Sequence, residues 1–461
     1  MDAPHSDALV FFGATGDLAY KQIFPALQAL IRHGRLDMPV VGIAKDDWSL
    51  DQFKARAKDS VEKHGGIDTA AFEKLCSLLN YVAGDYESPE TFAKLGKYLK
   101  GAKSPLHYLA IPPSLFATVA EGLAKTGCAE NARVMLEKPF GRDLASAKVL
   151  NATLHRFFSE EAVFRIDHFL GREPVQNLIY FRFANPLVEA GWNSRHIESV
   201  QITMAERFGV DSRGKLYEEL GAIRDVVQNH MLQVIAHLAM DCPSGKDPCS
   251  LRDERARLLK STRTLAPSDV LRGQYRGYRQ TQGVAPDSQV ETFAAARFYI
   301  DNDRWAGVPF HLRAGKCLPV TVTEVLVRFK RPRRPVLGDA GPPLVNYYRF
   351  RLNPEVVLAL GANVKKTGER MVGEPIELVA HHEPPDEMKP YERLLGDAAN
   401  GDPTLFVRED AVESSWRVVD SILGNVTPLY EYEPNTWGPP EAEKALVPEG
   451  GWHNPEPTEG V

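Results

Sequence analysis

The chain of 461 residues has few cysteines, no long apolar run and no excess of basic residues. Its five cysteines are widely scattered, with neither a CxxC pair nor clustered histidines. We therefore expect free thiols rather than a disulfide scaffold or a zinc site. No apolar run is long enough to span a bilayer. Because the formal net charge is −6, no overall basic field attracts nucleic acid or a lipid surface, and any phosphate must be bound locally.

Internal repeats and low-complexity tracts are also missing. Hydrophobic residues make up 43% of the chain and charged residues 25%, values typical of folded globular proteins rather than disordered or fibrous ones. The length predicts two or three domains at about 150 residues each. The first residues show no basic region followed by an apolar segment and a cleavage site, which predicts a cytoplasmic protein.

The amino-terminal part of the sequence alternates between short apolar runs and segments of helical periodicity. Residues 8–12 form an apolar run that ends at Gly13, and apolar residues then recur at helical spacing. Further apolar runs lie at 40–43, 81–82, 106–111 and 133–136, and a further helical segment lies at 51–64. This alternation predicts a doubly wound α/β domain of Rossmann type over residues 1–180, with ligands at the carboxyl ends of its parallel strands.

The pattern changes after about residue 195, where apolar and polar residues alternate at 200–204 and later at 325–329. Such alternation predicts half-covered antiparallel strands. Helical stretches lie at 222–240, 389–399 and 408–424, and the Pro/Gly-rich patches at 331–343 and 433–457 are expected to be loop and tail. We therefore predict a larger α+β domain over residues 181–461, with a mostly antiparallel sheet and packed helices.

A glycine turn, GATGDLA, stands where the first expected strand meets the first helix. Glycines at such a turn let the backbone approach a pyrophosphate at the helix N-terminus. The candidate cofactor ligands are Gly13, Ala14, Thr15, Gly16, Asp17 and Leu18. Because the full GxGxxG motif is incomplete, an ordinary strand-to-helix connection is the alternative.

Lys45 and Asp46 follow the second expected strand, where a dinucleotide-binding fold recognises the adenosine ribose. A cation at this place suits the 2′-phosphate of NADP, whereas a carboxylate suits the 2′-hydroxyl of NAD. A solvated surface pair is equally compatible with the local sequence. The sequence therefore leaves both cofactors open.

Three further segments concentrate ionisable groups. Lys138 precedes a proline at the end of an expected strand, so its side chain either faces the cleft or belongs to an ordinary turn. Residues 165–173 hold five ionisable groups in nine positions, a density that favours a site. His230 shares a helical face with valines, so it is either a core histidine or a general base oriented by Asp167.

Five motifs, GATGDLA, EKPFGRD, RIDHFLGRE, EELGAIRDVVQNH and RAGKCLP, occur in this order and resemble those of the glucose-6-phosphate dehydrogenase family. The resemblance implies oxidation of C1 of glucose 6-phosphate to 6-phosphoglucono-1,5-lactone with NADP, or in some members NAD, as the first step of the oxidative pentose phosphate pathway. It also implies a homodimer formed through the antiparallel sheet, or a homotetramer, with no nucleic-acid or membrane partner.

The resemblance also implies roles for individual residues. It makes His230 the general base, Asp167 the carboxylate that orients it, and Lys138 a residue between sugar and nicotinamide. The implied ligands of the sugar and its phosphate are His168, Arg172, Glu206, Asp225 and Lys316.

Several positions depart from the family pattern. Tyr20 and Gln22 replace two lysines of the glycine turn, Phe169 replaces a tyrosine, Arg172 replaces a lysine, and Thr321 stands where a basic residue is common. We therefore expect a weakened phosphate site. From Lys45 and Asp46 we expect both cofactors to work, with NADP moderately preferred.

Three alternatives remain open from the sequence alone. A relative could have drifted toward another sugar phosphate or a plain sugar, and the glucose–fructose oxidoreductase-like group shares the glycine turn and EKP strand but lacks the RIDH and QNH pair. A non-catalytic sensor of nucleotide or sugar phosphate is the third. Retention of Asp167, His168, Lys138 and His230 argues against such a sensor.

Overall fold

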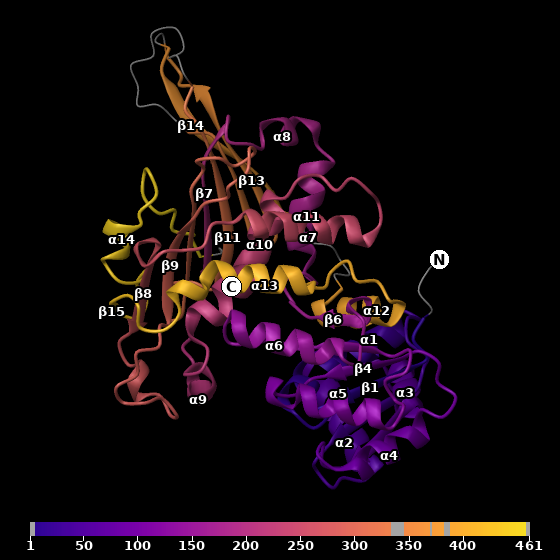
Figure 1. Cartoon of the computed structure of the whole chain (residues 1–461). Helices are drawn as coiled ribbons and strands as arrows, with labels where there is room; N and C mark the ends of the chain where they lie inside the picture. Colours follow the sequence, from indigo (N-terminus) through magenta and orange to yellow (C-terminus); the bar gives the residue numbers. More distant parts are fainter. Residues whose placement is uncertain (1–4, 333–344, 369–370, 382–387, 458–461) are drawn as a thin grey trace. The chain divides into compact units, whose positions relative to one another are not determined.

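The computed structural model describes residues 5–332, 345–368, 371–381 and 388–457, which fall into two compact units (Figure 1). Unit 1 comprises Met1–Glu173, Pro243–Asp253 and Met388–Glu413, and unit 2 comprises Pro174–Cys242, Glu254–Glu387 and Ser414–Val461. Unit 1 is therefore discontinuous, because two later segments return to it. Most of the loop expected at 331–343 lies outside the described residues.

Unit 1 contains a six-stranded parallel sheet in the order β3-β2-β1-β4-β5-β6. The strands are β1 (Ala8–Phe12), β2 (Val40–Ala44), β3 (Leu79–Ala83), β4 (Pro105–Leu109), β5 (Arg133–Leu136) and β6 (Val163–Arg165). The helices are η1 (Ala19–Ile23), α1 (Phe24–Arg32), α2 (Leu50–His64), α3 (Thr69–Leu78), α4 (Pro89–Tyr98), α5 (Phe116–Lys125), α6 (Leu144–His155) and, from the returning segment, α12 (Pro390–Asn400). This strand order is that of a doubly wound dinucleotide-binding fold, as the sequence predicts.

The central strands of this sheet are apolar along their whole length because both faces are covered. All residues of β1, β2 and β4 are buried, as expected for parallel strands between two layers of helices. Phe12, the last residue of β1, pairs with Ile43 of β2 and Leu109 of β4. The loops that follow these three strands therefore leave the sheet at one common edge.

Unit 2 contains a nine-stranded sheet in the order β14-β13-β12-β11-β7-β10-β9-β8-β15. The strands are β7 (Ile197–Ala205), β8 (Val270–Tyr275), β9 (Phe293–Phe298), β10 (Phe310–Gly315), β11 (Val322–Phe329), β12 (Tyr347–Asn353), β13 (Val357–Lys365), β14 (Gly373–His381) and β15 (Leu429–Tyr432). Only the β7–β10 and β8–β15 pairs of this sheet are parallel in the described residues. The prediction of a mostly antiparallel α+β domain is confirmed.

Helices cover one face of the nine-stranded sheet. They include α7 (Glu173–Phe183), α8 (Pro186–Gly191) and α10 (Leu232–Ala239), which Figure 1 shows beside the sheet. The Trp192 indole N–H donates to the Leu238 carbonyl at 2.8 Å, and Phe181 packs against Phe350 of β12 at 5.3 Å between ring centroids. The expected one-sided helical layer is therefore present.

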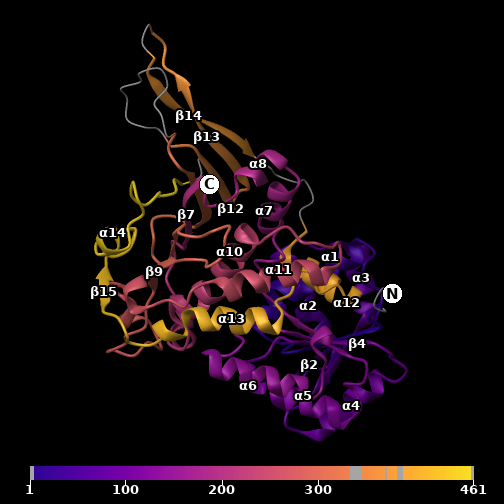
Figure 2. The ribbon, with the colours of Figure 1, turned by 45° about the horizontal axis from the view of Figure 1, so that its top comes forward.

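The opposite face of this sheet carries the C-terminal segment, which Figure 2 shows running back toward β7. Arg313 donates to the His453 carbonyl at 2.6 Å, and Arg351 donates to the Glu456 carbonyl at 3.0 Å. The patch at 433–457, expected to be tail, contains a short helix, α14 (Ala442–Ala445), and otherwise packs on the strands without regular structure.

The helix expected at 222–240 is divided between two geometries. Residues Ile223–Met231 form a π-helix, η5, and α10 continues from Leu232. The other expected helices correspond to α12 and to α13 (Glu409–Val419), which η8 (Asp420–Ile422) extends. The remaining α-helices are α9 (Gly214–Tyr217) and α11 (Pro248–Ser261).

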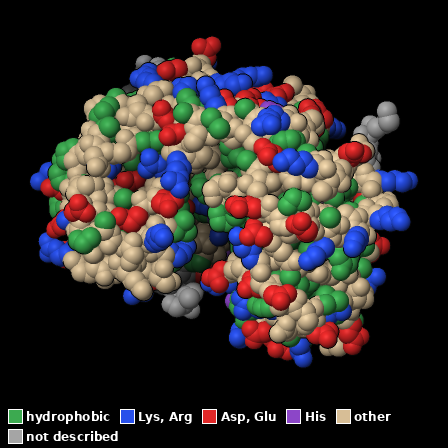
Figure 3. Space-filling view, turned by 60° about the horizontal axis from the view of Figure 1, so that its bottom comes forward, with side chains coloured by type: hydrophobic (Ala, Val, Ile, Leu, Met, Phe, Trp, Pro, Cys, Tyr) green, Lys and Arg blue, Asp and Glu red, His purple; other side chains and the backbone are tan. Residues whose placement is uncertain are grey.

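Neither the charge distribution on the surface nor the lengths of the helices depart from what the composition predicts. Lys and Arg are interspersed with Asp and Glu on the face that Figure 3 shows. None of the helices in the described ranges combines the length and apolar character needed to cross a membrane.

Candidate active site

The glycine turn of unit 1 follows β1 directly and leads into η1. Gly13 has a φ of +79°, and a Cβ there would overlap the Ala110 carbonyl oxygen, so only glycine fits. The Gly13 and Ala14 amides donate to the Ile43 carbonyl at 3.0 and 3.2 Å, which fastens the turn to the end of β2. The Tyr20 amide donates to Gly16 at 3.1 Å and starts the helix. Gly13 to Leu18 therefore form a turn at a helix N-terminus, which fits a pyrophosphate.

The residues after β2 lie against this turn. The Thr15 hydroxyl donates to the Asp46 carboxylate at 2.5 Å, so Asp46 reaches back to the glycine turn. Lys45 instead forms an ion pair with Asp85, which follows β3, at 3.1 Å. The Tyr81 hydroxyl donates to the Asp46 carbonyl at 2.6 Å and fixes the backbone of this loop.

A second group of predicted residues leaves the sheet after β5 and β6. Leu136 pairs with Arg165 in the parallel ladder, so Lys138 and Asp167 emerge at the same edge. The Lys138–Pro139 peptide is cis. The Asp167 carboxylate accepts the Phe169 amide at 2.9 Å and its carbonyl accepts the Leu170 amide at 3.0 Å, which makes a tight turn.

This turn presents His168 and Arg172. The Arg172 guanidinium lies 4.9 Å from the centroid of the Phe169 ring, a cation–π geometry. The His168 ring is stacked at 6.5 Å on Tyr391, which comes from α12 in the returning segment. Tyr391 lies more than 200 positions from His168 in the sequence, and no local motif marks it, so sequence reasoning missed it.

Tyr391 also contacts the carboxylate beside Lys138. Burial raises the pKa of the Glu137 carboxyl, while hydrogen bonds from Tyr108 and Tyr391 oppose that rise. The Tyr108 hydroxyl donates to Glu137 at 2.6 Å. These contacts hold the residue that immediately precedes Lys138.

Unit 2 holds an ion pair between the buried Lys316 and the half-buried Glu206. Ala205 and Gly315 end the parallel strands β7 and β10 and pair with each other, so the next residue of each strand emerges at one edge. The Lys316 ammonium donates to the Glu206 carboxylate. It also lies 5.3 Å from the centroid of the Tyr217 ring. The structure therefore brings these two predicted residues together.

Asp225 joins this cluster through η5. Burial raises the pKa of Tyr217, and the charges of Asp225, Glu291 and Glu206 raise it further. Asp225 and His230 are five residues apart on η5. Because π-helical hydrogen bonds join residues five apart, both side chains emerge on the same side of this helix.

Glu291 fixes the start of η5 and was not predicted from the sequence. Its carboxylate accepts the Ile223 amide at 3.0 Å, and burial raises its pKa. Gly221 has a φ of +65°, and a Cβ there would overlap the Glu291 carboxylate. In the sequence, only Gly221 followed by a helical segment could have indicated this contact.

Two of the departures from the family pattern have structural partners within their own unit. Tyr20 stands in place of a lysine of the family. Its hydroxyl donates to Asp59 of α2, and the Arg56 guanidinium lies 4.0 Å from its ring centroid. The Thr321 hydroxyl accepts the Arg207 amide at 3.0 Å. Both residues therefore stabilise local structure where the family often places a positive charge.

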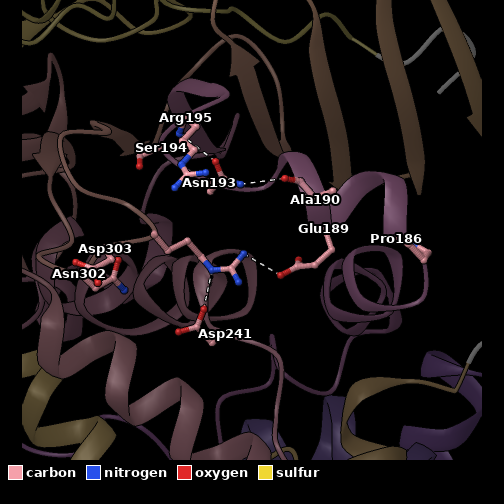
Figure 4. Close-up of a pocket in the computed structure, with 10 residues that line it drawn as sticks. Pro186, Glu189, Ala190, Asn193, Ser194, Arg195, Asp241, Asn302 and Asp303 are labelled. Atoms are coloured by element: carbon pink, nitrogen blue, oxygen red, sulfur yellow. Dashed lines mark hydrogen bonds and ion pairs between the residues drawn. The ribbon is translucent and has the colours of Figure 1, made fainter.

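A groove of about 790 Å³ lies elsewhere on unit 2, between α8 and the loop at 302–304 (Figure 4). Arg304 crosses it, and its guanidinium binds Asp241 at 2.6 Å and Glu189 at 2.8 Å. None of the predicted site residues lines this groove, so the groove does not compete with the clusters above.

The parallel sheet in the order 3-2-1-4-5-6 with a glycine turn after β1 defines the class of a dinucleotide-dependent dehydrogenase. The model of the NAD-binding domain of glucose-6-phosphate dehydrogenase matches residues 10–177, and the model of its C-terminal domain matches residues 179–453. The chain belongs to the glucose-6-phosphate dehydrogenase family. It is an NAD(P)-dependent oxidoreductase, and its activity is the first step of the oxidative pentose phosphate pathway.

Individual relatives agree over nearly the whole length. Glucose-6-phosphate 1-dehydrogenase 1 of Mycobacterium tuberculosis is 43% identical over 453 residues, which cover 98% of this chain and 97% of the relative. The Bacillus subtilis enzyme is 35% identical, with 97% of this chain and 98% of the relative covered. The crystal structure of the Mycobacterium avium enzyme superposes with a TM-score of 0.92 at 43% identity, covering 99% of this chain and all of that one. A structure of glucose-6-phosphate dehydrogenase with its substrate glucose-6-phosphate superposes with a TM-score of 0.90 at 34% identity over 99% of this chain and all of that one.

Proposed function

We propose that His230 is the general base of the reaction and that Asp167 orients it. The observation that carries this proposal is the cluster in unit 2, where Lys316 binds Glu206 and lies beside Tyr217, and where η5 carries both Asp225 and His230. A sugar needs several hydroxyl ligands beside one base. The cluster supplies two carboxylates, an ammonium and an imidazole from neighbouring segments of one unit.

The chemistry follows from the roles of these groups. A dinucleotide held by the turn from Gly13 to Leu18 would supply the nicotinamide as the acceptor for the hydride of C1. His230 removes the proton of the C1 hydroxyl, and the imidazolium that develops is stabilised by the carboxylate of Asp167. Glu206, Asp225 and Lys316 bind the sugar, His168 and Arg172 bind its phosphate, and Lys138 contacts both sugar and nicotinamide.

The dinucleotide is held by unit 1 in this proposal. The turn from Gly13 to Leu18 would bind the pyrophosphate through its backbone amides at the N-terminus of the following helix. Lys45 and Asp46 stand at the adenosine ribose. NADP and NAD are therefore both candidate cofactors of this site.

The substitution His230→Asn tests the proposed base. We expect kcat to fall by about 10²- to 10⁴-fold, the contribution typical of a general base, while glucose 6-phosphate binding changes little. The fall is measured from NADPH formation at 340 nm, and binding is measured by calorimetry. His196→Asn changes an exposed histidine of the same unit and is the matched control. An unchanged kcat in His230→Asn would make this residue a core histidine.

Asp167→Asn tests the orienting role separately. We expect a smaller fall in kcat than in His230→Asn, because the base itself remains and only its orientation and the charge beside it are lost. Adding Asp167→Asn to the His230 variant should change kcat little further, since both residues act through one proton transfer. Independent, multiplying effects would contradict the pairing.

We also propose that the chain is a cytoplasmic homodimer, or a homotetramer of such dimers, formed through the nine-stranded sheet. Its edge strand β14 exposes Ile376, Leu378 and Val379, and an exposed apolar edge of this length favours pairing with another chain. Light scattering after gel filtration should give a multiple of 51.3 kDa. Leu378→Lys should weaken the assembly, whereas Leu187→Lys, which changes an exposed leucine of α8, should not.

A further inference from the structure

The adenosine end of the proposed cofactor site carries more negative than positive charge. After β2, Lys45 is followed by two carboxylates, Asp46 and Asp47, and Asp85 follows β3, the neighbour of β2 in the sheet. One ammonium therefore stands among three carboxylates. A 2′-phosphate adds about two further negative charges at neutral pH, and like charges repel.

Asp46 is held in the position that suits a ribose hydroxyl. Its carboxylate accepts the Thr15 hydroxyl at 2.5 Å, so it lies between the end of β2 and the glycine turn. Its backbone is fixed as well, because its carbonyl accepts the Tyr81 hydroxyl at 2.6 Å and the Trp48 amide at 2.9 Å. A carboxylate at the end of this strand accepts hydrogen bonds from a ribose 2′-hydroxyl.

Lys45 is held away from that position by a second carboxylate. Its ammonium lies 3.1 Å from the Asp85 carboxylate. Asp85 is itself held in place, since it accepts the Glu87 amide at 2.9 Å. That hydrogen bond and then Lys45 lower the pKa of Asp85, so Asp85 is ionised at neutral pH and neutralises Lys45.

A second lysine near the turn is also paired. The ammonium of Lys21, in η1, lies 3.0 Å from the carboxylate of Asp17, which belongs to the turn. The ammonium groups of Lys45 and Lys21 are therefore each paired with an acidic side chain, and the Asp46 carboxylate is bound to Thr15 of the turn.

We infer that Asp46 and Asp85 together turn the adenosine pocket toward NAD: Asp46 binds the ribose 2′-hydroxyl and repels a 2′-phosphate, and Asp85 restrains the lysine that would attract one. This inference deepens the proposed function and depends on the dinucleotide site at the glycine turn. It assigns cofactor discrimination to a residue after β3, 40 positions from Lys45.

The test uses ligands that lack the nicotinamide, so that only the adenosine half is compared. Calorimetry on the full chain should show ADP-ribose binding more tightly than 2′-phospho-ADP-ribose, on the order of threefold or more, as exposed charge pairs allow. Asp46→Ser should make 2′-phospho-ADP-ribose the tighter ligand. The substitution removes both the charge that repels the 2′-phosphate and the carboxylate that accepts from the 2′-hydroxyl. Glu73→Gln removes one negative charge from α3, which leads into the opposite end of β3, and should leave the ratio unchanged.

Asp85→Asn isolates the second carboxylate. It should tighten 2′-phospho-ADP-ribose about threefold and leave ADP-ribose unchanged, and adding Lys45→Ala should abolish that gain. Tighter binding of 2′-phospho-ADP-ribose by the unmodified chain, with no response to either aspartate, would overturn the inference while the cofactor site stands. Failure of both ligands to bind a chain shown to be folded by circular dichroism would overturn the cofactor site itself, and the inference with it.

Discussion

At the scale of single residues, Phe169 and Arg172 show how one substitution depends on another. Phe169 lacks the hydroxyl of the tyrosine that it replaces. The Arg172 guanidinium lies 4.9 Å from the centroid of its ring, so the ring contacts the cation. A guanidinium can hold a phosphate through two parallel hydrogen bonds, whereas an ammonium acts as a compact point charge. At the proposed phosphate site, two of the family's contacts are therefore missing or re-aimed.

The double substitution Phe169→Tyr with Arg172→Lys tests this site. Each lost hydrogen bond to an ionised phosphate is worth about 1.5–3 kcal/mol, so restoring the family pair should lower the KM for glucose 6-phosphate by about tenfold or more. Turnover of plain glucose, measured in the same 340 nm assay, should not change. A higher KM in the double variant would mean that Arg172 already holds the phosphate well in its present pose.

The sequence identifies these residues but not their partners. Lys45 and Asp46 follow a recognisable strand, so their emergence at its end is predictable, whereas Lys316 is identified only from the RAGK motif. The pairing of Lys45 with Asp85 is not predictable, because it depends on how β2 and β3 align in the sheet. Our expectation that both cofactors work, with NADP moderately preferred, weighed Lys45 against Asp46 and could not include the contact of Lys45 with Asp85.

At the scale of elements, η5 connects backbone geometry with the proposed base. Its first amide, that of Ile223, is bound by the buried carboxylate of Glu291, which emerges just before β9. Gly221 gives the chain the left-handed turn that this contact requires, with a φ of +65°. The register of Asp225 and His230 therefore depends on a residue more than 60 positions away.

Gly221→Ala should disturb this element measurably. A left-handed conformation costs a non-glycine residue about 1–2 kcal/mol, and displacing Glu291 from the Ile223 amide costs about 1–3 kcal/mol more. Gly307→Ala is the matched control, because Gly307 has a φ of +77° and open space around its Cβ position. Urea unfolding should show the larger loss for Gly221→Ala, and only this variant should lose kcat. Equal losses in both variants would assign the whole effect to backbone strain.

Elements differ in how far the sequence predicts them. The strands of unit 1 follow from apolar runs bounded by turns, and β7 and β11 follow from alternation, because these patterns reflect local burial. The π-helix does not follow, since its apolar spacing also fits an α-helix. The return of α12 to unit 1 is likewise fixed by tertiary packing and leaves no mark in the local sequence.

At the scale of the whole molecule, the C-terminal segment packs on one face of the nine-stranded sheet of unit 2. His453 binds the buried carboxylate of Glu324 at 2.7 Å, and Glu324 also accepts Arg351 at 2.9 Å and Arg349 at 3.3 Å. The buried carboxylate of this strand residue is thus bound both by the neighbouring strand β12 and by the end of the chain. Docking of the final segment is therefore coupled to this charge.

Glu324→Gln should make this coupling visible as a pH-dependent loss of stability. Although burial opposes it, the interactions with His453 and Arg351 lower the pKa of Glu324 below its ordinary value of 4.5. A carboxyl with a lowered folded pKa stabilises the native state above its unfolded pKa, and that stabilisation disappears as the pH falls through the folded value. Removing one partner of a buried ion pair costs about 3–5 kcal/mol, so Glu324→Gln should be destabilised by roughly that amount at pH 7.

Urea unfolding at a series of pH values measures this effect. The stability difference between Glu324→Gln and the unmodified chain should be constant near neutral pH and shrink once the pH falls below 4.5 and through the folded pKa of Glu324. Glu433→Gln is the control, because Glu433 pairs with Arg276 where both side chains are more than half exposed, and such pairs contribute about 0–1 kcal/mol. A difference that persists unchanged below the folded pKa would show that Glu324 acts through packing rather than through its charge, and the C-terminal segment would then be held without it.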